Sequence, residues 1–160
     1  MSMSRHVVRL FAVLALLLAG AVSLVGCGGD SAPSAADYAA AVVKARDRTD
    51  YVLGRITRAG SSDELLNRMD EASAAIEGTA SELEDIGAAE GFEAETQKLV
   101  SALHQLSNDL AAFAHDARQP GGEVLLIGGP GLNFESWDNA NAALASLREQ
   151  GIQVQPIGRH

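Results

Sequence analysis

The chain of 160 residues is poor in cysteine, proline and aromatic residues: it has one cysteine, four prolines, four phenylalanines, two tyrosines and one tryptophan. A single cysteine excludes an intramolecular disulfide and a cysteine-based structural zinc site. With so few large side chains, an alanine-rich core is filled when helices with small side chains pack at short distances from one another. The composition therefore favours an all-α fold over a sandwich or a barrel.

Basic residues are also scarce, because 12 lysines and arginines face 21 aspartates and glutamates. This excess of negative charge repels the phosphates of nucleic acids, and no stripe of lysine and arginine interrupts it. The sequence predicts no nucleic-acid partner.

The sequence lacks the common catalytic and ligand-binding motifs. It has no Glu-x-x-His pair for a di-metal bundle, no Gly-x-Ser-x-Gly elbow, and no Gly-Lys-Ser/Thr ending for a phosphate loop. The charged clusters at predicted helix ends are typical of solvated surface. We therefore expect no enzyme activity, no cofactor and no metal site.

The N-terminal segment has the features of a signal peptide. Arg5 and Arg9 give a positive start, and an apolar run of 17 residues follows from Leu10 to Gly26. A transmembrane helix needs about 20 apolar residues, and no basic stop signal follows this run. The segment is predicted to direct export.

The end of this run identifies a more specific class. Leu24-Val25-Gly26-Cys27 resembles the lipobox of bacterial lipoproteins, in which an aliphatic residue, a small or branched residue and glycine or alanine precede a cysteine. The resemblance implies that the Cys27 thiol receives a diacylglyceryl group and becomes the mature N-terminus. It also implies that the protein is anchored at the outer face of the cell membrane. A secretory signal that happens to contain cysteine, and an uncleaved anchor, are the alternatives.

The predicted cleavage divides the chain into a signal peptide (1–26), a flexible tether (27–35) and a helical domain (36–160). It removes two of the 12 basic residues and none of the 21 acids, which leaves a formal charge of −11. The abundance of alanine, glycine and arginine over lysine is typical of high-GC bacteria such as the actinobacteria.

Three segments carry apolar residues at alternating spacings of three and four. They run from Tyr38 to Ile56, from Leu65 to Ile86 and from Phe92 to Ala117. This spacing indicates helices that pack almost antiparallel at an angle near 20°. Pro33-Ser34 and the box Ser61-Ser62-Asp63-Glu64 mark the first two helix starts.

A fourth helix is expected around Trp137, with Asn133 as its cap and Gly151 as a left-handed stop. The tail after Gly151 alternates apolar and polar residues, so we expect it to lie extended along the helices. The fold predicted is an up-down antiparallel four-helix bundle.

The stretch Gly121 to Leu132 is an aliphatic run between glycines, and it is predicted to be a loop. Two hypotheses remain open for Val124, Leu125 and Ile127. They plug the open end of the bundle, or they form an exposed apolar flap that contacts lipid or a partner protein.

The polar candidates for a site are on the fourth helix, where Trp137 is followed by Asn141. They belong either to the core and a helix cap, or to a small-ligand site in a cleft beside the 121–132 loop. Two functions follow: a membrane-anchored lipoprotein with a structural or protein-interaction role or, alternatively, a lipoprotein that binds a small ligand near Trp137.

Overall fold

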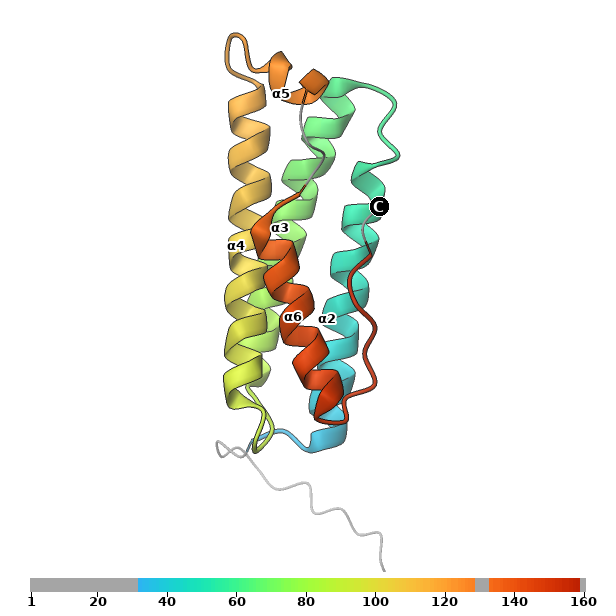
Figure 1. Cartoon of the computed structure of the whole chain (residues 1–160), viewed down its shortest axis with the longest axis vertical. Helices are drawn as coiled ribbons and strands as arrows, with labels where there is room; N and C mark the ends of the chain where they lie inside the picture. Colours follow the sequence, from blue (N-terminus) through green and yellow to red (C-terminus); the bar gives the residue numbers. More distant parts are fainter. Residues whose placement is uncertain (1–31, 129–132, 159–160) are drawn as a thin grey trace, which may run out of the picture. The chain divides into compact units, whose positions relative to one another are not determined.

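The computed structural model describes residues 32–128 and 133–158 (Figure 1). The predicted lipidation site Cys27, the predicted signal peptide and residues 28–31 of the predicted tether lie outside the described residues. So do residues 129–132, which end the predicted apolar loop, and the last two residues of the chain.

The described residues form five packed helices: α2 (Ala35–Ile56), α3 (Ser62–Ile86), α4 (Glu93–Ala117), α5 (Glu123–Gly128) and α6 (Glu135–Glu149). No strand is present in residues 32–128 and 133–158, which confirms the all-α class. The number of helices is one more than predicted, because residues 123–128 form a short helix where a loop was expected. None of the helices in these ranges is long and apolar enough to cross a membrane.

The helix starts follow the predicted capping chemistry at two of the four long helices. The Ser34 and Ser61 hydroxyls accept hydrogen bonds from the N–H groups of Asp37 and Glu64. Each bond satisfies a donor that has no partner inside the helix. At α6 the prediction was wrong, because the cap residue is Phe134 rather than Asn133 and it makes no side-chain cap bond.

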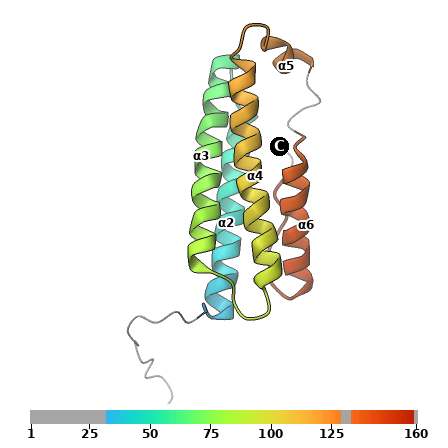
Figure 2. The same ribbon diagram turned by 90° about the vertical axis from the view of Figure 1, so that its left-hand side faces the viewer.

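The long helices pack in chain order: α2 packs on α3, α3 on α4, and α4 on α6 (Figures 1 and 2). The buried seams follow the predicted spacing with small shifts. The predicted spacing places Val52 and Leu65 on the seams, but these two residues are half-buried and their neighbours Leu53 and Leu66 are buried instead. A straight helix has 3.6 residues per turn, so a seam drawn at 3.5 drifts from the buried face over several turns.

Helix α4 buries more of its surface than one seam, because it contacts α3 on one side and α6 on the other. Val100, Ala102 and Ser107 lie on this wider buried surface. The Ser107 hydroxyl donates to the Ser73 carbonyl oxygen of α3 at 3.0 Å, so this polar contact is satisfied inside the core.

The end of α6 and the segment after it agree with the prediction. Gly151 has a φ of +104°, and the Ile152 N–H donates to the Leu147 carbonyl oxygen at 3.0 Å, as in a Schellman motif. In the extended tail, Ile152, Val154 and Ile157 are buried, whereas the residues that alternate with them are exposed. The tail lies between α6 and α2 (Figure 1), two helices with few contacts of their own.

Candidate functional site

The two polar candidates on α6 bind the C-terminal tail. The Trp137 ring is 5% exposed, and its Nε1 donates to the Ile157 carbonyl oxygen at 3.4 Å. Asn141 binds the same residue twice: its Nδ2 donates to the Ile157 carbonyl oxygen at 3.1 Å, and its Oδ1 accepts from the Ile157 N–H at 2.7 Å. Asn141 therefore pairs with the tail backbone as a neighbouring strand would.

Helix α2 holds the tail from the opposite side through two residues that the sequence analysis missed. Arg46 donates from Nε and Nη2 to the Pro156 carbonyl oxygen at 2.9 and 2.6 Å. The Asp50 carboxylate accepts from the Gly158 N–H at 2.7 Å. Arg46 and Asp50 are one helical turn apart, and that spacing is the only sequence signal that could have indicated them.

These contacts determine what the region around Trp137 can do. The polar groups of Trp137 and Asn141 that could bind a ligand are engaged by the Ile157 backbone. A ligand at this position would have to displace the tail and its three buried apolar side chains. The observed arrangement is a strap that joins α2 to α6.

Helix α5 presents aliphatic side chains to solvent. Val124 is 67% exposed and Leu125 is 40% exposed, whereas Leu126 packs against the core. Of the two hypotheses, the one in which Val124 and Leu125 plug the bundle is therefore wrong, because Leu126 takes the inward position. Ile127 belongs to α5, but its side chain lies outside what the structure describes.

The turn before α5 depends on two glycines. Gly121 has a φ of +83°, a backbone conformation that other residues rarely adopt. A Cβ at Gly122 would lie 2.2 Å from the Asp116 carbonyl oxygen. The turn is closed by hydrogen bonds from the Gly122 N–H to the Gln119 carbonyl oxygen and from the Leu125 N–H to the Gly122 carbonyl oxygen. The backbone at Gly122, just before α5, thus lies closely against the end of α4.

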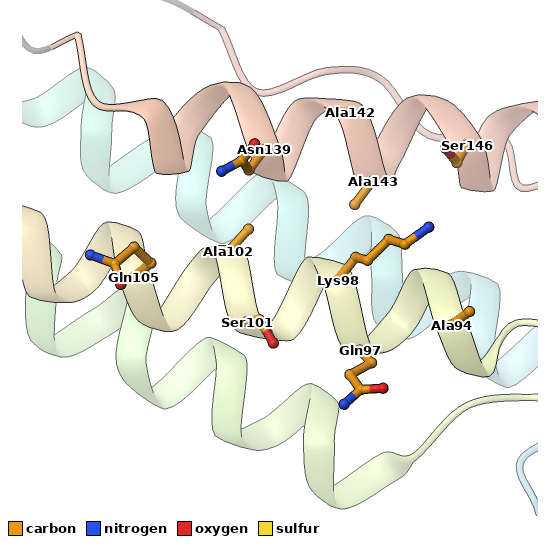
Figure 3. A pocket seen from close by; sticks show the side chains of 10 residues that line it. All are labelled: Ala94, Gln97, Lys98, Ser101, Ala102, Gln105, Asn139, Ala142, Ala143 and Ser146. Atoms are coloured by element: carbon orange, nitrogen blue, oxygen red, sulfur yellow. The ribbon is translucent and has the colours of Figure 1, made fainter.

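A groove of about 670 Å³ lies between α4 and α6 (Figure 3). Ala102 and Ala143 are buried at its floor, where the two helices approach each other, and Lys98 is the only charged residue in its lining. The rim carries amide and hydroxyl groups from Gln97, Ser101, Gln105, Asn139 and Ser146. The floor of the groove is therefore the surface where small residues of α4 and α6 pack, and its edge is polar.

A second groove, of about 850 Å³, follows the outer face of α2 beside the start of the tail. Lys44 and Arg48 at its edge both bind Glu82 of α3, at 3.1 and 2.7 Å. The hydrogen bond from Arg48, followed by that from Lys44, holds the pKa of Glu82 below its usual range. Tyr51 also lines this groove, with 63% of its surface exposed.

Residues 32–128 and 133–158 contain no group of three or more histidine, cysteine, aspartate and glutamate side chains that could hold a metal ion. His104 lies on α4, where its ring nitrogens are 2.9 Å from Glu77 and 3.8 Å from Glu84 of α3. This histidine links two helices through exposed acids.

The chain was compared with protein-family models, curated proteins and solved structures, and none of them matches it.

Proposed function

We propose that the chain is a lipid-anchored protein at the outer face of the cell membrane, and that its helical domain has a protein-interaction role. The lipobox at residues 24–27 supports the anchor. Each methylene group that enters the bilayer contributes roughly 0.8 kcal/mol, so two acyl chains hold a protein durably on a membrane. The exposed aliphatic residues of α5 support the interaction role, because Val124 and Leu125 are adjacent and form one apolar patch for a partner to cover.

We propose that α2, α3, α4 and α6 form an up-down antiparallel bundle of four helices. The packing of consecutive helices supports this arrangement. In this proposal the tail fills the side of the bundle where α2 and α6 would otherwise touch, and α5 caps one end.

The position of α5 favours a protein partner over the bilayer. The chain enters α2 at the end of the helices opposite to α5 (Figure 1). Helix α2 has 22 residues, which corresponds to about 33 Å at a rise of about 1.5 Å per residue. A domain tethered through residues before Ala35 would carry Val124 and Leu125 at its far end.

The extent of the apolar surface favours a transient contact. A stable interface buries about 800 Å² on each partner, and two exposed aliphatic side chains supply only part of that area. We therefore propose that α5 inserts Val124 and Leu125 into an apolar pocket of a partner protein.

The anchor is tested by Cys27→Ser, which removes the thiol that would carry the lipid. We expect the variant to move from the membrane fraction to the soluble or secreted fraction. A Cys27→Ser protein that remains in washed membranes as fully as the original chain would contradict lipid anchoring through this residue.

The interaction surface is tested with a photocrosslinking amino acid at Val124 in intact cells. We expect a discrete adduct that Leu125→Asp removes, and whose partner, once identified and purified, binds the protein directly. The same crosslinker at Ser101, in the α4–α6 groove, is the matched control. Equal adducts at both positions would contradict a partner surface at α5.

The tryptophan separates this proposal from the small-ligand alternative. Trp137 is the only tryptophan in the chain, so its fluorescence reports on one place. We expect sugars and small metabolites to leave the emission unchanged, because the tail occupies the polar groups beside the ring. Saturable quenching by one of them would favour the ligand-binding alternative.

A further inference from the structure

Helix α5 exposes three consecutive side chains at the end of the domain: Glu123, Val124 and Leu125. Successive residues of a helix are about 100° apart around its axis, so the directions of these three side chains span about 200°. Leu126 takes the opposite side and packs against the core. Glu123 therefore forms one edge of the exposed apolar surface, and a protein that covers Val124 also meets the Glu123 carboxylate.

A second acid lies beside the start of α5. Asp116 is in the last turn of α4, and its carbonyl oxygen is 2.2 Å from the position that a Cβ at Gly122 would occupy. The backbone just before Glu123 is therefore in close contact with the backbone at Asp116. Both acidic side chains are exposed, and neither forms an ion pair within residues 32–128 and 133–158.

The arginines near this end of the domain do not neutralise these two acids. Three of them bind acids of α3, in the pairs Arg55–Glu71, Arg68–Glu64 and Arg118–Asp70. Arg58, in the turn between α2 and α3, is the fourth. Within the part of the chain that the structure describes, Arg58 has no ion pair, and neither have three exposed acids: Asp63, Asp116 and Glu123. The surface around α5 therefore has more free negative charge than free positive charge.

We propose that the α5 surface binds a protein whose apolar pocket is edged by lysine or arginine. This inference rests on the proposed interaction role of α5 and specifies the chemistry of the partner. The pocket covers Val124 and Leu125, and its basic residues face Glu123 and Asp116. Opposite charges at the edge of an interface accelerate the encounter of two proteins and disfavour wrong partners. The excess of 21 acids over 12 bases in the whole chain acts in the same direction at longer range.

The same charges disfavour a second copy of this chain as the partner. In a two-fold contact a surface meets itself, so two copies could pack their aliphatic residues together only by bringing their acids together as well. Like charges that face each other across an interface weaken association. A partner with basic residues at the same positions instead gains from each of these acids.

The test measures how the two acids affect the yield of the adduct formed by a photocrosslinking amino acid at Val124 in intact cells. Glu123→Gln with Asp116→Asn removes both charges and keeps the size of the side chains. We expect this double substitution to lower the adduct yield, per molecule of protein in the membrane, by roughly fivefold, because two exposed charge pairs are lost.

The matched control removes the same amount of charge from the other end of the domain. Asp85 at the end of α3 and Glu90 before α4 are exposed, form no ion pair in the described residues and lie far from α5 (Figure 1). Asp85→Asn with Glu90→Gln should leave the adduct yield unchanged. Asp116→Asn alone, which does not alter the sequence of α5, should lower the yield by about twofold.

Three outcomes would overturn the inference and leave the α5 surface as proposed. They are a full adduct yield in the double variant at Glu123 and Asp116, an equal loss in the control at Asp85 and Glu90, and an adduct that joins two copies of this chain. The absence of any discrete adduct from the chain that keeps both acids would instead contradict the proposed function, and the inference with it.

Discussion

The side chain of Asn141 forms two hydrogen bonds with the backbone of Ile157, one through its amide N–H and one through its carbonyl oxygen. The same tail is held on its other side by Arg46 and Asp50 of α2. An asparagine on one helix and an arginine on another thus clamp an extended segment that belongs to neither. The side of the domain between α2 and α6 depends on these contacts.

Asn141→Ala should destabilise the fold, because the Ile157 N–H and carbonyl oxygen would lose their partner in a partly buried position. We expect a loss of about 1–3 kcal/mol in the free energy of unfolding, measured by urea denaturation. Asn139→Ala, on the exposed side of the same helix, is the control and should change stability by less than about 0.5 kcal/mol. Equal effects of the two substitutions would show that the clamp contributes nothing.

Tyr38→Phe tests a hydrogen bond in the core. The Tyr38 and Thr96 hydroxyl oxygens are 2.5 Å apart, and the Thr96 hydroxyl also bonds the Phe92 carbonyl oxygen at 2.7 Å. Because Thr96 keeps that second bond, we expect the substitution to cost only about 1 kcal/mol of unfolding free energy. Tyr51→Phe is the exposed counterpart and should cost nothing measurable.

The same tyrosine predicts a response to alkaline pH. Burial raises the pKa of Tyr38 above its ordinary value of 10.0. In the unfolded chain the ring ionises near pH 10, whereas the folded protein holds it neutral to higher pH. Stability is therefore intact below about pH 10 and falls as the pH rises through the folded pKa. Chemical denaturation from pH 8 to 11 should show that the free energy of unfolding falls less steeply with pH in Tyr38→Phe than in the original protein. The same pH dependence in both proteins would show that burial of Tyr38 does not cause the loss.

Gly122 and Gly78 are expected to respond in opposite ways to substitution by alanine. Gly122→Ala would place a methyl group 2.2 Å from the Asp116 carbonyl oxygen, so α5 must shift away from α4. We expect a loss of at least about 1 kcal/mol and weaker photocrosslinking at Val124. A Cβ at Gly78, in the middle of α3, meets nothing within 4 Å. Gly78→Ala should stabilise the protein by about 0.5–1 kcal/mol. Both variants are measured by thermal unfolding, and a stabilising Gly122→Ala or a destabilising Gly78→Ala would contradict the prediction.

Thr49→Val is expected to increase stability. Among the buried side-chain oxygen and nitrogen atoms of residues 32–128 and 133–158, only Thr49 Oγ1 has no hydrogen-bond partner. Replacing this hydroxyl with a methyl group removes an unsatisfied polar atom at nearly constant volume, and we expect a gain of about 1 kcal/mol. Thr79→Val is the comparison, because the Thr79 hydroxyl donates to the Ala75 carbonyl oxygen at 2.8 Å. A similar gain at both positions would mean that the hydrogen bond is irrelevant.

The sequence predicted the regular parts of the fold well, because they depend on local signals. Ser34 and Ser61 cap their helices, and Gly151 stops α6. These residues act within one turn of their own position. Their chemistry is therefore readable without knowledge of the tertiary structure.

The candidate site was less predictable, because its contacts join distant parts of the chain. Arg46 and Pro156 are separated by 110 positions, and no local pattern relates an arginine on a helix to a carbonyl oxygen in a tail. Helix α5 was missed for another reason. The aliphatic run at 124–127 has strand propensity, but no other strand is present in the described residues to pair with it, so its backbone satisfies itself as a helical turn.

The tail also imposes an order on folding. Arg46 and Asp50 are synthesised early, yet their partners at Pro156 and Gly158 emerge after helices α2 to α6 have been made. A chain that is made from its N-terminus first can bury the contacts of α2, α3 and α4 while the side between α2 and α6 is still open. We expect the closing of that side to be a late, long-range step. Chains interrupted before Ile152 would display an unfilled apolar slot to proteases, which would distinguish finished molecules from incomplete ones.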